Sequence, residues 1–73
     1  MELKIYSLEG TLFEGTVSQV SLPTTSGEIT VLKNHIPLIT TLKSGVIKFG
    51  KENISIEGGF AEIGKGKVVV LVN

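Results

Sequence analysis

The sequence lacks cysteine, tryptophan, arginine and aspartate, and it contains a single histidine. Without cysteine the chain forms no disulfide, and one imidazole alone provides too few ligands for a structural zinc site. Seven lysines balance seven glutamates, so the formal net charge is zero. Nucleic-acid-binding proteins typically carry a basic surplus and use arginine to contact phosphate and guanine. The composition therefore argues against a nucleic-acid partner.

Long apolar runs are also missing. No stretch approaches the roughly 20 apolar residues that a membrane-spanning helix needs, and the start does not resemble a signal peptide. Any contact with a membrane is therefore expected to go through a partner protein. The 73 residues suffice for one domain, residues 1–73. A domain of this size buries only about 60% of its unfolded surface, so docking onto something larger is expected to help stabilise it.

Apolar and polar residues alternate along most of the chain, which predicts short β-strands. Leu3 and Ile5, for example, face one way, while Lys4 and Tyr6 face the other. The alternation slips near Ser18–Gln19, which predicts a bulge or a bend into a second sheet. No segment has a sustained helical period. The sequence thus predicts an all-β fold, a β-sandwich or flattened barrel of about ten short antiparallel strands.

Turn-forming residues divide the predicted strands, and inward-phase apolar residues predict the core. Breaks are expected at residues 9–10, 15, 23–27, 34–37, 44–45, 50–53, 58–59 and 64–66. Some of the apolar residues are expected to coat a docking face instead, because such faces are apolar at their centre. The predicted core consists of Leu3, Ile5, Val17, Val20, Ile29, Val31, Leu42, Ile47, Ile54, Ile56, Phe60 and alternate residues of 68–72.

One segment matches the spacing of a phosphate-binding loop, GxxxxGK, over residues 59–65. That mechanism needs a flexible loop, a Ser or Thr after the lysine, and a helix that follows. Gly66 stands at the Ser/Thr position, and a β-branched run follows Lys67. A strand, a turn and a second strand account for the same residues, so no nucleotide site is predicted.

Catalytic chemistry is equally weakly supported. His35 is the only imidazole, no aspartate is present to orient it, and no serine stands out as a nucleophile. The glutamates are scattered and form no evident acid–base pair. A small hydrolase would need His35 and a serine within hydrogen-bond reach in one pocket. A free-standing all-β binding or carrier module, for example of the biotinyl or lipoyl type, stays open as an alternative. Lys51 and Lys65 lie in predicted turns, but neither has the flanking motif that such a carrier needs.

Essentially the whole chain resembles a known family in a series of ordered motifs. The motifs are Leu3–Ile5, Phe13–Gly15, Leu22–Ile29, Leu32–Thr40 with its Asn-His-x-Pro-Leu turn, Gly45–Ile47, Gly58–Ile63, and Val68–Leu71. Together they resemble the N-terminal β-sandwich domain of the epsilon subunit of F-type ATP synthase. Departures such as Lys33, where proline is common in the family, remove none of the turn glycines.

This resemblance implies a ten-stranded sandwich that acts as a non-catalytic rotor part of the central stalk. It implies contacts with the gamma subunit and with the membrane ring of c subunits, and a role in coupling proton or sodium flow to ATP synthesis. It implies no cofactor, and a peripheral position on the cytoplasmic face of the bacterial membrane or the equivalent organelle side. Family members usually continue into two C-terminal helices that can inhibit hydrolysis. A chain that stops at Asn73 is expected to assemble without restraining ATP hydrolysis.

The resemblance also assigns contact residues. Each has a plainer explanation: Glu28 opens a strand on its solvent side, His35 caps a turn, and the hydroxyl residues lie at strand edges. The residues assigned to the c ring are Ser26, Gly27, Glu28 and His35, and those assigned to gamma are Ser7, His35 and Thr40.

Overall fold

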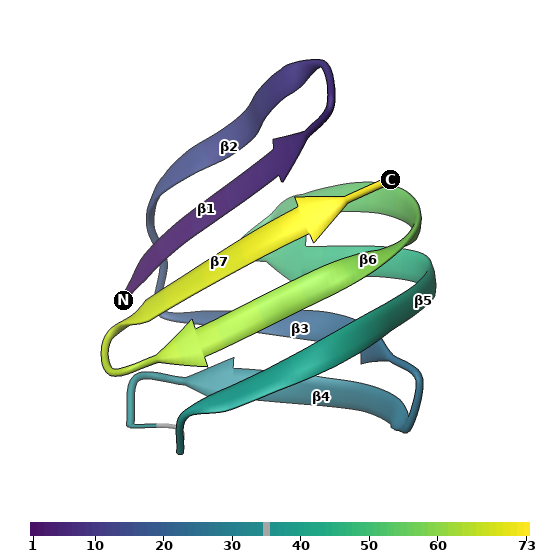
Figure 1. The fold of residues 1–73 in the computed structure, drawn as a ribbon. Helices are drawn as coiled ribbons and strands as arrows, with labels where there is room; N and C mark the ends of the chain where they lie inside the picture. The colour runs from purple at the N-terminus through teal and green to yellow at the C-terminus, as the bar shows by residue number, and fades with distance from the viewer. Residues whose placement is uncertain (35) are drawn as a thin grey trace.

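A computed structural model describes residues 1–34 and 36–73, and within these residues seven β-strands form one continuous sheet (Figure 1). The all-β prediction is confirmed. The strands are β1 (Glu2–Ser7), β2 (Gly10–Thr16), β3 (Gln19–Thr24), β4 (Gly27–Leu32), β5 (Leu38–Phe49), β6 (Glu52–Gly64) and β7 (Lys67–Val72).

The sheet folds over on itself into two layers. Its strand order is β2-β1-β7-β6-β5-β3-β4, and neighbours are antiparallel except for the parallel pair β1 and β7. Figure 1 shows β5 and β6 curving together from one layer into the other. The front layer contains β2, β1, β7 and residues 59–64 of β6, paired with residues 38–42 of β5. The back layer contains β4, β3 and the other halves of β5 and β6.

Two long strands replace four of the short ones that the sequence predicts. The expected breaks at residues 44–45 and 58–59 are bends through which β5 and β6 remain paired, with Lys43 opposite Gly58 and Gly45 opposite Ile56. Gly58 and Gly59 have φ values of 151° and 147°, a region that residues with side chains rarely adopt. The glycines therefore turn the strands without ending them. The count is seven rather than about ten because β5 and β6 each serve in both layers, and because β2 continues through Gly15, where the sequence predicts a break.

The slip in alternation near Ser18–Gln19 marks a change of layer, as predicted. β2 ends at Thr16 in the front layer and β3 begins at Gln19 in the back layer. The bulge lies elsewhere: β1 and β2 shift register between Ile5 and Tyr6, which leaves Leu12 as the extra residue of β2.

The core fills the space between the layers. Most of the predicted core residues are buried, and Val17, Ile29 and Ile54 are partly buried and pack against them. The prediction for Phe60 is wrong: its side chain is 58% exposed. The buried set is Leu3, Ile5, Val20, Leu22, Val31, Leu42, Ile47, Phe49, Ile56, Ala61, Ile63, Val68, Val70 and Val72.

The exposure of Phe60 has a local cause. Before the bend the inward residues of β6 are Ile54 and Ile56, whereas after it they are Ala61 and Ile63. Gly58 and Gly59 are both buried, so the phase shifts by one residue as the strand changes layer. A slip of one residue moves every later side chain to the other face. Phe60 consequently points outwards.

Candidate functional site

The predicted c-ring contact lies at the β3–β4 turn, which is held in place by a buried hydroxyl and by the backbone. Thr24 is 2% exposed; its hydroxyl donates to the Gly27 carbonyl at 2.5 Å and accepts from the Ser26 N–H at 3.2 Å. The Thr25 N–H donates to the Thr41 carbonyl at 3.1 Å, which ties the turn to β5. Ser26 is thus presented at an exposed, fixed tip, next to Gly27 and Glu28 at the start of β4.

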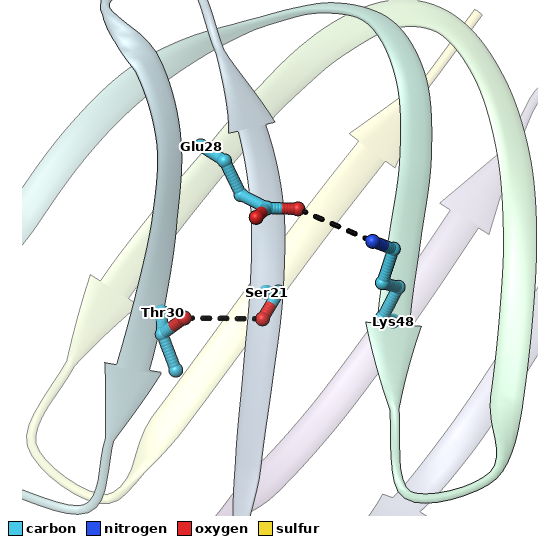
Figure 2. A network of polar contacts seen from close by, with 4 residues as sticks. All are labelled: Ser21, Glu28, Thr30 and Lys48. Carbon is cyan, nitrogen blue, oxygen red and sulfur yellow. Dashed lines mark hydrogen bonds and ion pairs between the residues drawn. The ribbon is translucent and has the colours of Figure 1, made fainter.

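Glu28 lies beside a lysine of another strand. Its Oε2 is 3.6 Å from Lys48 Nζ of β5, with the Glu28 carboxylate over the intervening β3 and the Lys48 ammonium beside β5 (Figure 2). The Ser21 and Thr30 hydroxyls are 3.1 Å apart in the same group of polar residues. Both charged side chains are more than half exposed, so the ion pair contributes at most about 1 kcal/mol to stability.

Ser7 closes the β1–β2 turn. Its hydroxyl donates to the Gly10 carbonyl at 3.4 Å and accepts from the Glu9 N–H at 3.2 Å. It also lines a shallow depression of about 360 Å³ that includes Phe60 and Leu71. The predicted gamma contact is therefore both a turn cap and a neighbour of exposed apolar side chains.

Thr40 lies on a different part of the front layer. It follows the inward phase of β5 and is partly buried, with its hydroxyl 3.5 Å from the Thr41 carbonyl. β7 and β6 separate Ser7 on β1 from Thr40 on β5. Three strand spacings amount to roughly 14 Å, so these two residues share a layer but not a site. His35, assigned to both partners, lies outside the described residues.

Exposed apolar side chains gather on the outer surface of the front layer. Leu71 of β7 stands opposite both Phe60 of β6 and Tyr6 of β1, which makes one row across three strands. Val69 and Ile39 belong to the next row, on either side of Glu62. We call this surface the apolar face; its residues are Tyr6, Ile39, Phe60, Val69 and Leu71.

The apolar face is unusually exposed for side chains of this type. Ile39 is 73% exposed, Phe60 58% and Leu71 55%. A second depression of about 470 Å³ lies at one end, lined by residues that include Ile39, Glu62, Lys67 and Val69. Contiguous exposed apolar surface, as in the row of Tyr6, Leu71 and Phe60, marks an interaction site in soluble proteins.

The outer surface of the back layer is of the opposite character. Ser21 of β3, Thr30 of β4 and Lys48 of β5 lie in one row across three strands, and Asn53 of β6 stands opposite Lys48. Ser55 of β6 is exposed beside them. We call this surface the polar face. The two outer surfaces of the sandwich therefore differ in chemistry, and only the apolar face has the composition of an apolar docking surface.

The described residues offer no cluster of side chains for metal binding. Among residues 1–34 and 36–73 there is no group of three or more His, Asp, Glu or Cys side chains that could hold a metal ion. The segment that matches a phosphate-binding loop is the end of β6 and the Lys65–Gly66 turn. In the same described part of the chain, no helix is long and apolar enough to cross a membrane.

Two features of the surface were not found by sequence reasoning. Lys48 was not singled out, because it is 20 residues from Glu28 and only the strand order brings them together. The apolar face was expected in general, but its members were not identified. Its one sequence signal is the Gly58–Gly59 pair, which reverses the phase of β6 before Phe60.

The sequence matches the family described as ATP synthase, delta/epsilon chain, β-sandwich domain, over residues 1–73. It is 36% identical over 77 aligned residues to the ATP synthase epsilon chain of Synechococcus sp., covering 100% of this chain and 56% of that protein. It is 47% identical over 74 residues to the ATP synthase epsilon chain of Endomicrobium trichonymphae, covering 96% of this chain and 54% of that protein. The chain thus spans little more than half the length of these relatives.

Two solved structures share the fold. A chain of the Tetrahymena thermophila mitochondrial ATP synthase central stalk and c ring superposes with a TM-score of 0.81 at 15% identity, over 99% of this chain and 62% of that one. A chain of the Euglena gracilis mitochondrial ATP synthase OSCP/F1/c-ring structure superposes with a TM-score of 0.87 at 23% identity, over 96% of this chain and 48% of that one. With the match over its whole length, the chain belongs to the family of the ATP synthase delta/epsilon chain β-sandwich domain.

Proposed function

We propose that this chain is a non-catalytic rotor part of the central stalk of an F-type ATP synthase. In this role it joins the gamma subunit to the c ring and helps couple proton or sodium flow to ATP synthesis. It reaches the membrane through the complex, on the cytoplasmic face of the bacterial membrane or the equivalent organelle side. Family membership supports the assembly, and the surface chemistry supports the mode of docking.

The observation that carries the proposal is the difference between the two outer surfaces. Phe60 and Leu71 are adjacent on the apolar face and each is more than half exposed. Burying one such side chain contributes about 1.5–3 kcal/mol. On the polar face Leu32 of the edge strand β4 is 54% exposed, but the residue opposite it is Gln19, so it forms no apolar pair across strands. We assign the apolar face, with Ser7 at its margin, to the gamma subunit.

The β3–β4 turn is assigned to the c ring. Ser26, Gly27 and Glu28 lie at an exposed tip that the Thr24 hydroxyl holds rigid. A rigid polar tip suits repeated contact with identical loops of a ring, because little conformational entropy is lost at each contact. Thr40 of β5 remains a proposed contact with gamma. His35 remains a proposed contact with both gamma and the ring.

The proposal is tested by co-purification of the tagged chain with ATP synthase from membranes of its source cells. Leu71→Lys places a charge in the middle of the apolar face and is expected to reduce recovery of gamma at least tenfold. Leu71 is exposed, so this variant should fold normally. Ser55→Lys is the matched control, since it adds the same charge to an exposed position on the polar face.

The two variants separate docking from folding. Full recovery of gamma with Leu71→Lys would contradict the assigned face. Failure of the unchanged chain to recover any ATP synthase subunit would contradict the proposed function itself. Urea unfolding of each variant checks that stability is retained.

A further inference from the structure

Glu28 is presented to solvent as half of an ion pair. Lys48 stands opposite Ser21, and Ser21 stands opposite Thr30, two residues along β4 from Glu28. The Glu28 side chain reaches over β3, and its Oε2 lies 3.6 Å from Lys48 Nζ, which stays beside β5 (Figure 2). No other Lys–Glu ion pair forms among the described residues, although all seven lysines and all seven glutamates belong to them.

Both charges keep most of their bonding capacity. The side chain of Lys48 is 57% exposed and that of Glu28 is 56% exposed. An ammonium group has three donors and a carboxylate has about four acceptor positions, so one contact leaves the others free. The adjacent Ser21 and Thr30 hydroxyls bond to each other at 3.1 Å. A partner could thus bind both head groups without breaking their contact.

The pairing changes what kind of partner fits. A purely basic loop would be attracted to Glu28 and repelled by Lys48 at nearly the same distance, so the two terms would largely cancel. A loop that offers a cation next to a carboxylate or carbonyl oxygen would satisfy both charges. Charge arrangements of this kind select partners more than they add affinity.

We infer that Lys48 is a specificity-determining residue, which acts together with Glu28 as a two-charge contact for a partner loop bearing a cation beside an acceptor. This inference rests on the proposed function, because it concerns the contact assigned to the c ring. Glu28 then accepts from the cation of the partner, and the Lys48 ammonium donates to the neighbouring oxygen.

The test uses the full chain and membrane vesicles from cells that lack it but retain the rest of the ATP synthase. A Lys65→Cys replacement in the β6–β7 turn gives one labelling site, since the chain has no other cysteine. Binding of the labelled chain to the vesicles is measured for Lys48→Met, for Glu28→Gln and for the exchanged pair E28K/K48E. Lys51→Met, in the β5–β6 turn, removes a lysine charge from an exposed position elsewhere.

The inference predicts that Lys48→Met and Glu28→Gln each weaken binding about two- to fivefold, the range for exposed ion pairs. The exchanged pair should restore the internal ion pair yet bind as weakly as the single variants, because the polarity that faces the partner is reversed. Lys51→Met should bind like the unchanged chain, and circular dichroism should show that every variant is folded under the conditions of the binding assay.

Other results would overturn the inference. Tighter binding of Lys48→Met would mean that Glu28 acts alone against a basic loop. Unchanged binding of Lys48→Met would show that Lys48 does not contact the partner. Normal binding of the exchanged pair E28K/K48E would show that Lys48 only holds Glu28 in place through their ion pair. Absence of binding by the unchanged labelled chain would instead contradict the proposed function.

Discussion

Gly59 is the residue whose replacement the fold tolerates least. A Cβ atom at this position would overlap the Leu71 carbonyl oxygen and lie 2.9 Å from the Val72 Cα, and the φ of Gly59 is 147°. Both atoms belong to the backbone of β7, so they cannot move aside without breaking the pairing of β6 and β7. Gly59→Ala is expected to lower the free energy of unfolding by about 3 kcal/mol or to prevent folding.

Gly66→Ala is the control for this prediction. Gly66 also has a positive φ, of 69°, but no atom lies within 4 Å of the place that a Cβ would occupy. Its replacement is therefore expected to cost about 1–2 kcal/mol, from backbone strain alone. Urea denaturation followed by circular dichroism measures both variants. Equal losses at the two positions would show that the close approach of β7 does not matter.

At the scale of elements, alternation was sufficient to predict strands but not their length. A glycine pair within a sequence indicates a break, and nothing local distinguishes a turn from a bend that keeps its partner. Whether β6 continues depends on the register of β5 opposite it, which is set by contacts distant in the sequence. Alternation alone also placed Phe60 in the predicted core, because it does not show that the bend at Gly58–Gly59 shifts the inward phase by one residue.

The contact residues were predictable from sequence only where they depend on local turn residues. The β3–β4 turn could be located from Pro23–Gly27, because turn chemistry is local. The pairing of Glu28 with Lys48 and the gathering of Tyr6, Phe60 and Leu71 depend on strand order. Strand order is not encoded in any short window of sequence, so these features required the structure.

The position of each strand in the sheet predicts its hydrogen exchange. β1, β7 and the second half of β6 have neighbours on both sides, whereas β2 and β4 have one. Edge strands leave alternate amides without a partner in the sheet, and they open at lower free-energy cost. We expect the amides of Ile5, Val70 and Ile63 to exchange at least tenfold more slowly than those of residues 11–15, as measured by NMR.

One result would contradict the predicted difference in hydrogen exchange between central and edge strands. Protection of β2 equal to that of β7 would indicate that β2 is covered in solution, for example by a second copy of the chain. Measurement at several protein concentrations distinguishes such covering from intrinsic stability.

At the scale of the whole molecule, the free chain is expected not to bind ATP. Residues 59–64 pair with β7 along their length, from Gly59 opposite Val72 to Gly64 opposite Lys67. Their amides are therefore not arranged as the loop that a phosphate-binding site needs. Addition of millimolar Mg-ATP should leave the amide spectrum unchanged, with sodium chloride of equal ionic strength as the control. Shifts confined to residues 59–66 would contradict this.

The continuity of β5 and β6 has a mechanical consequence. In most sandwiches, only packed side chains and loops resist sliding of one layer over the other. Here two adjacent backbones pass through both layers and stay paired across the bend, from Leu38 opposite Ile63 to Phe49 opposite Glu52. A tangential force applied to the front layer would be carried to the back layer by covalent chain under tension. Such a domain is expected to pass load from one layer to the other with little relative movement of the layers.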